Sequence, residues 1–156
     1  MTQLLETRPT GAIAEHAAAL QDTLIELIDL SLQAKQGHWN VVGPTFGPVH
    51  ALLDTFTDEY RDWYDTVAER ITAIGVSPDG RSTTVAVGTP LVQLPEGQIE
   101  DRFLLAWFDE RVTLVAARVG DRVGQLADID AASQDVLIEV LRGLDKQRWM
   151  IRAHRV

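Results

Sequence analysis

Four side chains in the segment 48–74 have the types and spacing of metal ligands. His50 and Asp54 are four residues apart, and so are Asp65 and Glu69. On an α-helix, residues i and i+4 lie on the same face, so each pair would present two ligands together. At about 100° per residue, all four fall in one polar band, clear of the apolar stripe of the same helix. Imidazole and carboxylate groups of this kind suit iron, manganese or zinc.

A charged band opposite an apolar stripe is ordinarily a solvated helix face, so a purely structural helical oligomer is one interpretation of this segment. Two features of the band favour a packed face instead. The two ligand pairs have matching spacing, and the band carries small residues that would let another backbone come close. The small residues are Gly47, Ala51, Ala68 and Thr72.

The two ligand pairs are too far apart to share one metal ion within a single chain. Their centres lie about 15 residues apart, or about 22 Å along a helix. A second copy of the helix, antiparallel across a two-fold axis, would bring His50 and Asp54 of one copy to Asp65 and Glu69 of the other. Two equivalent sites would result, and two-fold contacts are the commonest protein symmetry.

Other candidates carry less information by themselves. A histidine near a helix C-terminus, such as His38, ordinarily interacts with the helix dipole and does not bind a metal ion. Trp39 beside it is expected in the core. His16 has no partner at a useful spacing, and we expect it on the surface. Asp58 and Arg61 lie midway along the band. We predict that they pair across the two-fold axis, although they could equally form an ordinary i,i+3 surface pair.

Apolar spacing predicts the helices that would position these side chains. Hydrophobic residues recur at intervals of three and four, the period of an amphipathic helix, in four long segments. These segments are about 11–38, 48–74 and 98–125, and a fourth that begins near 131 or 133 and ends near 152. Gly, Pro and short polar residues separate them, as expected where helices end. The sequence therefore predicts an all-α fold.

The connection 76–98 is unusually long for a compact domain, and we expect one short helix in it, around 83–87. Such a connection would let the second and third long helices run parallel. That topology is typical of a ferritin-like four-helix bundle with a crossover and not of a simple up-down bundle. We expect a short N-terminal tail over 1–10, the bundle over 11–153 and a short C-terminal end over 154–156.

Composition excludes several other classes. The chain has 156 residues, no Cys and a net charge of −9, so thiolate metal sites and disulfides are impossible and one domain is the natural expectation. We expect no signal peptide, and the sequence shows no run of about 20 apolar residues. We expect a cytoplasmic protein with no membrane partner. The acidity favours cations over nucleic acid as partners.

Several segments together resemble the Dps family, the mini-ferritins named for DNA protection in starved bacterial cells, over essentially the whole chain. The segments are Lys35–Asn40, Val49–His50, Leu53–Asp54, Asp65–Arg70, Thr89–Leu91 and Leu144–Lys146. The resemblance implies a ferroxidase centre at a two-fold interface. One chain would contribute His38, His50 and Asp54 to this centre, and the other chain would contribute Asp65 and Glu69.

The resemblance also implies an activity and an assembly. In the family, Fe(II) is oxidised at the shared sites, with hydrogen peroxide preferred to dioxygen, and ferric oxide is stored inside a dodecameric shell. Iron is thus the expected metal, ferroxidase the expected activity and protection against oxidative damage the expected role. Trp39, beside the site, would donate electrons or trap radicals, or else pack in the interface.

Iron needs an entry path, and in the family acidic residues near the start of the last helix line three-fold pores. Here Asp128, Asp130 and Asp135 occupy that stretch. Aspartate at the start of a helix is also an ordinary cap, so both interpretations stay open.

DNA binding is the point where this sequence departs from the family pattern. Members that bind DNA use tails rich in Lys and Arg, whereas the segment 1–10 has only Arg8, offset by Glu6. The acidic excess, multiplied over a shell, would repel phosphates. We expect weak or absent DNA binding. The alternative function is a nucleoid-associated, DNA-compacting shell protein with little ferroxidase activity.

Overall fold

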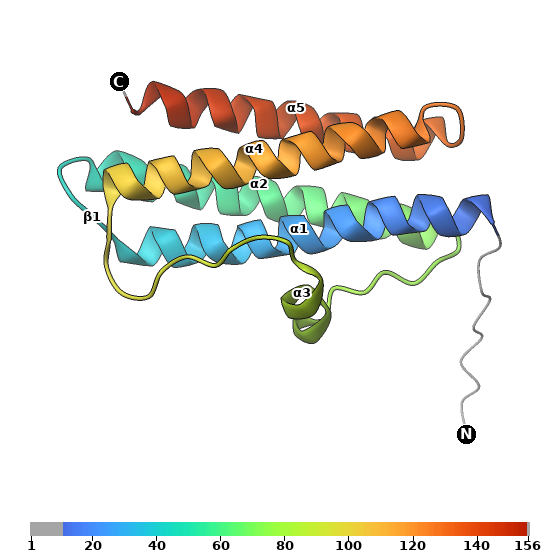
Figure 1. Cartoon of the computed structure of the whole chain (residues 1–156), viewed down its shortest axis with the longest axis horizontal. Coiled ribbons are helices and arrows are strands. Elements are labelled where there is room, and N and C mark those ends of the chain that lie inside the picture. The colour runs from blue at the N-terminus through green and yellow to red at the C-terminus, as the bar shows by residue number, and fades with distance from the viewer. Residues whose placement is uncertain (1–10, 156) are drawn as a thin grey trace.

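The computed structural model describes residues 11–155, and the four predicted long helices are present in it (Figure 1). They are α1 (Ala12–Asn40), α2 (Phe46–Ala73), α4 (Asp101–Leu126) and α5 (Ala131–Ala153). The short helix α3 (Ser82–Gly88) lies between α2 and α4, as predicted. Strands β1 (Val41–Val42) and β2 (Ile99–Glu100) form a short parallel pair. The expected tail over 1–10 and the terminal residue 156 lie outside the described residues.

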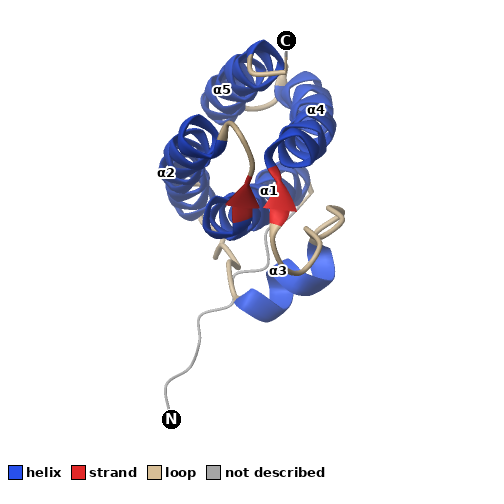
Figure 2. Ribbon diagram, turned by 90° about the vertical axis from the view of Figure 1, so that its left-hand side faces the viewer, coloured by secondary structure: helices blue, strands red, loops and turns tan. Residues whose placement is uncertain are grey.

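The path of the chain confirms the predicted crossover. Short turns make α1 and α2 antiparallel neighbours, and likewise α4 and α5, whereas the connection between α2 and α4 runs back along the whole bundle (Figure 1). Helices α2 and α4 therefore run in the same direction. Viewed end-on, the four long helices surround one core and α3 lies outside it (Figure 2). Among the helices described, none combines the length and apolar character that crossing a membrane requires.

The apolar stripes of the four helices form the core. Each fully buried large side chain contributes about 1.5–3 kcal/mol relative to an exposed one. Those with no exposed area include Leu20, Leu27, Phe56, Tyr60, Leu104, Leu137 and Leu144. Phe103, in the first turn of α4, is 50% exposed, although Leu104 beside it is fully buried.

Polar side chains of α1, partly or fully buried, hold the crossover against the bundle. Gln21 exchanges two hydrogen bonds with the backbone of Asp79, at 2.8 and 2.9 Å. The carboxylate of Asp29, 3% exposed, accepts hydrogen bonds from Thr89 and Gln93. Buried carboxylates and amides need such partners, so the crossover satisfies polar groups that would otherwise destabilise α1.

A second contact joins the α1–α2 turn to the start of α4. The buried carboxylate of Asp101 accepts hydrogen bonds from the backbone N–H and the hydroxyl of Thr45. A Cβ added at Gly43 would lie 2.6 Å from this carboxylate, and its φ of 131° is one that L side chains rarely adopt. Glycine is therefore required where the turn passes Asp101.

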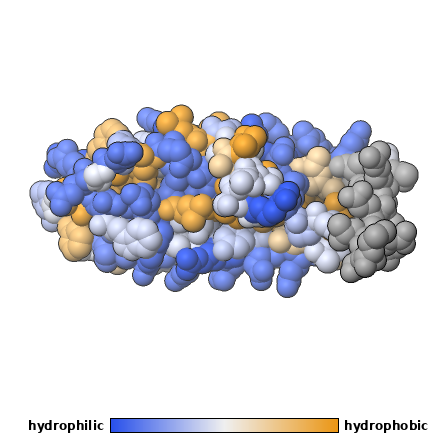
Figure 3. Space-filling model, turned by 90° about the horizontal axis from the view of Figure 1, so that it is seen from below, coloured by the Kyte–Doolittle hydropathy of each residue, from blue (hydrophilic) through white to orange (hydrophobic). Residues whose placement is uncertain are grey.

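Apolar side chains interrupt the hydrophilic surface on the face from which α3 projects (Figure 3). Three elements of this side carry exposed apolar residues: Leu32 of α1 is 61% exposed, Val87 of α3 is 89% exposed, and Val92 of the crossover is 65% exposed. Exposed apolar groups gathered on one side of a small protein are typical of a contact surface.

Candidate metal centre

His38 at the end of α1 and His50 near the start of α2 form a reciprocal pair. Their rings stack with centroids 3.6 Å apart, and each Nδ1 lies 2.8 Å from the backbone oxygen of the other residue. A carbonyl oxygen only accepts, so each Nδ1 carries a proton and donates it. Each Nε2 of the neutral ring is then left with its lone pair, which is the form in which imidazole binds a metal ion.

Close packing at the end of α1 makes this histidine pair possible. A Cβ added at Gly37 would contact side chains of Leu53, Leu104 and Phe108 at 3.2–3.3 Å, so α1 approaches its neighbours closely here. His38 is 9% exposed and His50 half-buried. The carbonyl of His38 belongs to the last turn of α1, where carbonyls lack helical partners, and the imidazole of His50 satisfies it.

One turn further from the α1–α2 turn, Lys35 and Asp54 form an ion pair between the same two helices. The ammonium group of Lys35 holds the pKa of Asp54 below its usual value, mainly through this hydrogen bond. Nδ1 of His38 lies 3.9 Å from the same carboxylate oxygen. His38, His50 and Asp54 therefore stand next to one another, with an ionised carboxylate and two imidazoles.

Asp65 and Glu69 lie far along α2 and are both exposed. Asp65 borders a hollow that Leu24, Ile28 and Ala68 also line, so apolar side chains lie to one side of it. Within residues 11–155, no three His, Asp or Glu side chains are arranged to hold a metal ion. One chain thus presents two incomplete groups of ligand types at separate places on one helix.

The surroundings of the histidine pair differ from the sequence expectation in one respect. Trp39 is 68% exposed and is not a core residue, because it points away from the packed face that Gly37 and His38 occupy. Phe46 is also partly exposed, and its ring centroid lies 5.0 Å from that of His50. Asp58 and Arg61 form the ordinary i,i+3 surface pair, at 3.9 Å, within one chain.

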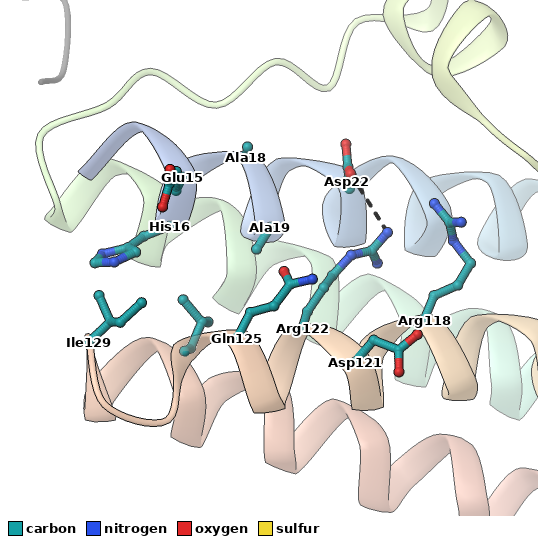
Figure 4. A pocket seen from close by; sticks show the side chains of 11 residues that line it. Glu15, His16, Ala18, Ala19, Asp22, Arg118, Asp121, Arg122, Gln125 and Ile129 are labelled. Atoms are coloured by element: carbon teal, nitrogen blue, oxygen red, sulfur yellow. Dashed lines mark ion pairs between the residues drawn. The ribbon is translucent and has the colours of Figure 1, made fainter. Parts of the chain in front are cut away.

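His16 is buried, with 8% of its surface exposed, so the expectation of a surface position is wrong. Its imidazole lies between α1 and the loop that carries Ile129, beside a hollow of about 610 Å³ between α1 and α4 (Figure 4). Asp22 and Arg122 form an ion pair across this hollow, at 3.8 Å. The histidine pair is at the other end of α1, so this hollow takes no part in the candidate site.

The three acidic residues near the start of α5 have different environments. Asp130 is the N-cap of α5: its carboxylate accepts from the backbone N–H groups of Ala132 and Ser133, and from two hydrogen bonds of Arg70 on α2. Burial raises the pKa of Asp130, but the hydrogen bonds from the Ser133 hydroxyl, from Arg70 and from the Ser133 backbone outweigh it, so the pKa lies below its usual value. Asp128 and Asp135 are exposed.

Sequence reasoning missed the part that Lys35 plays. From the sequence, Lys35 was noted only as the first residue of the segment Lys35–Asn40, and no role was assigned to it. One signal in the sequence could have indicated the contact between Lys35 and Asp54. Lys35 lies three residues before His38, and the helix that carries both is antiparallel to the one that carries His50 and Asp54. Pairing across the two helices follows from that register, because side chains at i and i+3 share a face.

Sequence comparison connects the whole chain with known proteins. The family model described as a ferritin-like domain matches residues 17–156. The DNA protection during starvation protein 2 of Deinococcus radiodurans is 35% identical over 144 residues, and the match covers 92% of this chain and 60% of that protein. The chain thus spans less than two thirds of that relative. The DNA protection during starvation protein of Agrobacterium fabrum is 32% identical, with 94% of this chain and 91% of that protein covered.

Structural comparison agrees with the sequence. A crystal structure of Dps92 from Deinococcus radiodurans superposes with a TM-score of 0.91 at 35% identity, covering 92% of this chain and 87% of that one. The family match, the similarity to curated relatives and the shared fold extend over the helices that carry the candidate ligands. The chain therefore belongs to the Dps family of ferritin-like proteins.

Proposed function

We propose that the protein is a ferroxidase that oxidises and stores iron at sites shared by two copies of the chain. His38, His50 and Asp54 of one copy would face Asp65 and Glu69 of a second copy across a two-fold axis. One observation carries the proposal. Helix α2 presents two groups of ligand-type side chains at separate positions, and neither group holds a metal ion alone.

The two groups have complementary chemistry. The histidine pair supplies two imidazoles whose Nε2 atoms take no part in the Nδ1 bonds, and the three carboxylates supply oxygen ligands. Such ligands suit Fe(II) and leave coordination positions open for an oxidant. Two Fe(II) ions would each lose one electron, and one hydrogen peroxide would take both electrons and two protons to give two water molecules. This stoichiometry avoids the hydroxyl radical that a single electron would release.

The same proposal covers the assembly and its environment. The exposed apolar side chains of α1, α3 and the crossover, together with Trp39 and Phe46, would be covered by further copies in a dodecameric shell that stores ferric oxide. The exposed Asp128 and Asp135 remain candidates for an iron entry path, whereas the bonds of Asp130 suit a cap. We place this activity in the cytoplasm, as protection against peroxide with Fe(II).

Replacing one ligand from each group tests the site. In His38→Ala combined with Asp65→Ala, oxidation of Fe(II) by hydrogen peroxide, followed by the absorbance of ferric products, should fall to the rate without protein. His154→Ala is the matched control, because His154 is exposed and bonds only to the carbonyl of Met150. A double variant as fast as the parent protein would show that the assignment is wrong.

A further inference from the structure

A hollow of about 390 Å³ lies at the end of the bundle where the α1–α2 turn, the start of α4 and the C-terminal end of α5 come together (Figure 1). The described residues that line it are Thr45, Arg102, Leu105, His154 and Arg155. Two of them are arginines and none is an aspartate or a glutamate, although the chain as a whole has a net charge of −9. None of the five candidate metal ligands lines this hollow.

Arg102, on the α4 side, brings a guanidinium group that forms no ion pair within residues 11–155. The backbone N–H of Arg102 donates to Asp101 at 2.8 Å. That carboxylate is 1% exposed and also accepts hydrogen bonds from the N–H and the hydroxyl of Thr45. Because the carboxylate of Asp101 is bonded inside the fold, the exposed guanidinium group of Arg102 stays available to a ligand.

Arg155, on the α5 side, shares its carboxylate with a second arginine. Its NH1 donates to Asp109 at 2.9 Å, and Nε of Arg152 donates to the other oxygen of Asp109 at 3.0 Å. One carboxylate thus faces two guanidinium groups, and one positive charge is left without compensation. A guanidinium group has five N–H donors, so Arg155 keeps donors for a ligand beside its bond to Asp109.

The two arginines lie on different helices, and this arrangement favours a ligand that accepts hydrogen bonds from several directions. A phosphate monoester carries about −1.5 to −2 charges at neutral pH and three acceptor oxygens. The planar fork of arginine binds such a group through two parallel hydrogen bonds. A carboxylate has one charge and two oxygens, so one fork alone satisfies it. The volume of the hollow falls within the range of small-molecule pockets, and Leu105 supplies an apolar part of its wall.

We propose that this hollow binds a small phosphorylated molecule. Arg102 and Arg155 hold the phosphate group between α4 and α5, and Leu105 faces the carbon atoms that carry it. The two arginines carry the assignment, whereas His154 only lines the hollow. The site uses none of the candidate metal ligands, so the inference does not depend on the proposed iron chemistry.

Calorimetric titration tests the site without iron or turnover. The full chain, treated with a chelator, is titrated in a buffer free of phosphate with glycerol 3-phosphate and, separately, with inorganic phosphate. The parent protein should bind glycerol 3-phosphate more tightly than inorganic phosphate, which has no carbon part. Arg102→Gln and Arg155→Gln should each weaken the binding of glycerol 3-phosphate about tenfold or more, because each removes a hydrogen bond between charged groups.

Arg142→Gln is the matched control for net charge. Arg142 is exposed on the same helix, about 20 Å along α5 from Arg155, and does not line the hollow. This variant should bind glycerol 3-phosphate like the parent protein. Circular dichroism checks that every variant keeps the helical content of the parent, which is expected because all three arginines are exposed.

Four results would overturn the proposal. They are a parent protein that binds neither phosphate compound at millimolar concentration, equal binding of the two compounds, equal weakening in Arg142→Gln, and displacement of glycerol 3-phosphate by a DNA oligonucleotide without terminal phosphates. The last result would identify nucleic acid as the occupant, and equal binding would identify free phosphate. Weaker binding of glycerol 3-phosphate in Arg102→Gln and Arg155→Gln, but not in Arg142→Gln, supports the site.

Discussion

At the scale of single residues, the pair of His38 and His50 has two roles. Each imidazole ties its own helix to the carbonyl of the other residue through Nδ1, and the same bond fixes which nitrogen is free. Both bonds join groups of the protein itself. The ligands are therefore oriented before metal binds, which lowers the entropic cost of completing the site.

Removing one imidazole should destabilise the protein even without metal. In His50→Ala, the carbonyl of His38 loses its donor, and we expect the free energy of unfolding to fall by about 1–2 kcal/mol. Urea denaturation with a chelator present, at fixed protein concentration, measures this difference. His154→Ala should stay within about 0.5 kcal/mol of the parent protein. Equal stability of His50→Ala and the parent would contradict a structural role for the pair.

At the scale of the helices, Asp130 joins α5 to α2. Its carboxylate caps the first turn of α5 and receives two hydrogen bonds from Arg70, at 2.8 and 2.9 Å. The last helix is thereby held against the helix that carries four of the five candidate ligands. An iron entry path through this region would depend on the exposed neighbours Asp128 and Asp135 instead.

Replacing this cap should cost stability in a pH-dependent way. In Asp130→Ala we expect a loss of about 2 kcal/mol at neutral pH, because a cap and a partly buried charged partner are removed together. The pKa of Asp130 is lower in the folded chain than in the unfolded one. The stabilisation is therefore complete above the unfolded pKa, about 4, and is lost as the pH falls below it.

Thermal unfolding at several pH values checks this expectation. The difference between Asp130→Ala and the parent protein should shrink below about pH 4. Asp128→Ala is the matched control: this neighbour is exposed, and we expect a change within about 0.5 kcal/mol. A gap that widened in acid would mean that Asp130 is not held ionised in the fold.

The elements also show how far sequence reasoning reaches. The last helix was expected to begin near 131 or 133 and to end near 152, and α5 spans Ala131–Ala153, because apolar spacing and caps are local signals. His16 was expected on the surface but is buried, and Trp39 was expected in the core but is exposed. Both depend on which neighbouring helix covers a face, and one segment of sequence does not contain that information. The contact between Lys35 and Asp54 likewise depends on the register of two antiparallel helices, which no single segment encodes.

At the scale of the whole molecule, a shared site makes a prediction about mixtures. His38→Ala and Asp65→Ala should each be inactive as pure assemblies. When the two chains are unfolded and reassembled together, a mixed dimer has one site with both defects and one site with none. Random pairing should restore about one quarter of the parent activity, the consequence of a two-fold interface.

The measurement is the rate of Fe(II) oxidation per chain after joint reassembly. Separate reassembly followed by mixing is the control, because subunits that do not exchange cannot complement one another. A jointly reassembled sample that remained inactive, although circular dichroism and size matched the parent assembly, would place all the ligands within one chain.

DNA binding also depends on the whole molecule, because it depends on the net charge. With a net charge of −9 on each chain, we expect no retardation of DNA in a gel-shift series at neutral pH, even at low salt. Retardation that persists to moderate salt would instead favour the DNA-compacting shell as the function, since only several cation–phosphate contacts survive such screening.

Helix α2 is uninterrupted from Phe46 to Ala73, and it carries ligands near both of its ends. Inserting one residue between Asp54 and Asp65 would rotate the distal ligands by about 100° and shift them by about 1.5 Å. If the sites are shared as proposed, a two-fold axis would use this helix twice, and both sites of a dimer would be lost together. Over evolution, insertions and deletions should therefore be absent from this stretch, and variation in chain length should collect at the chain ends and in the crossover.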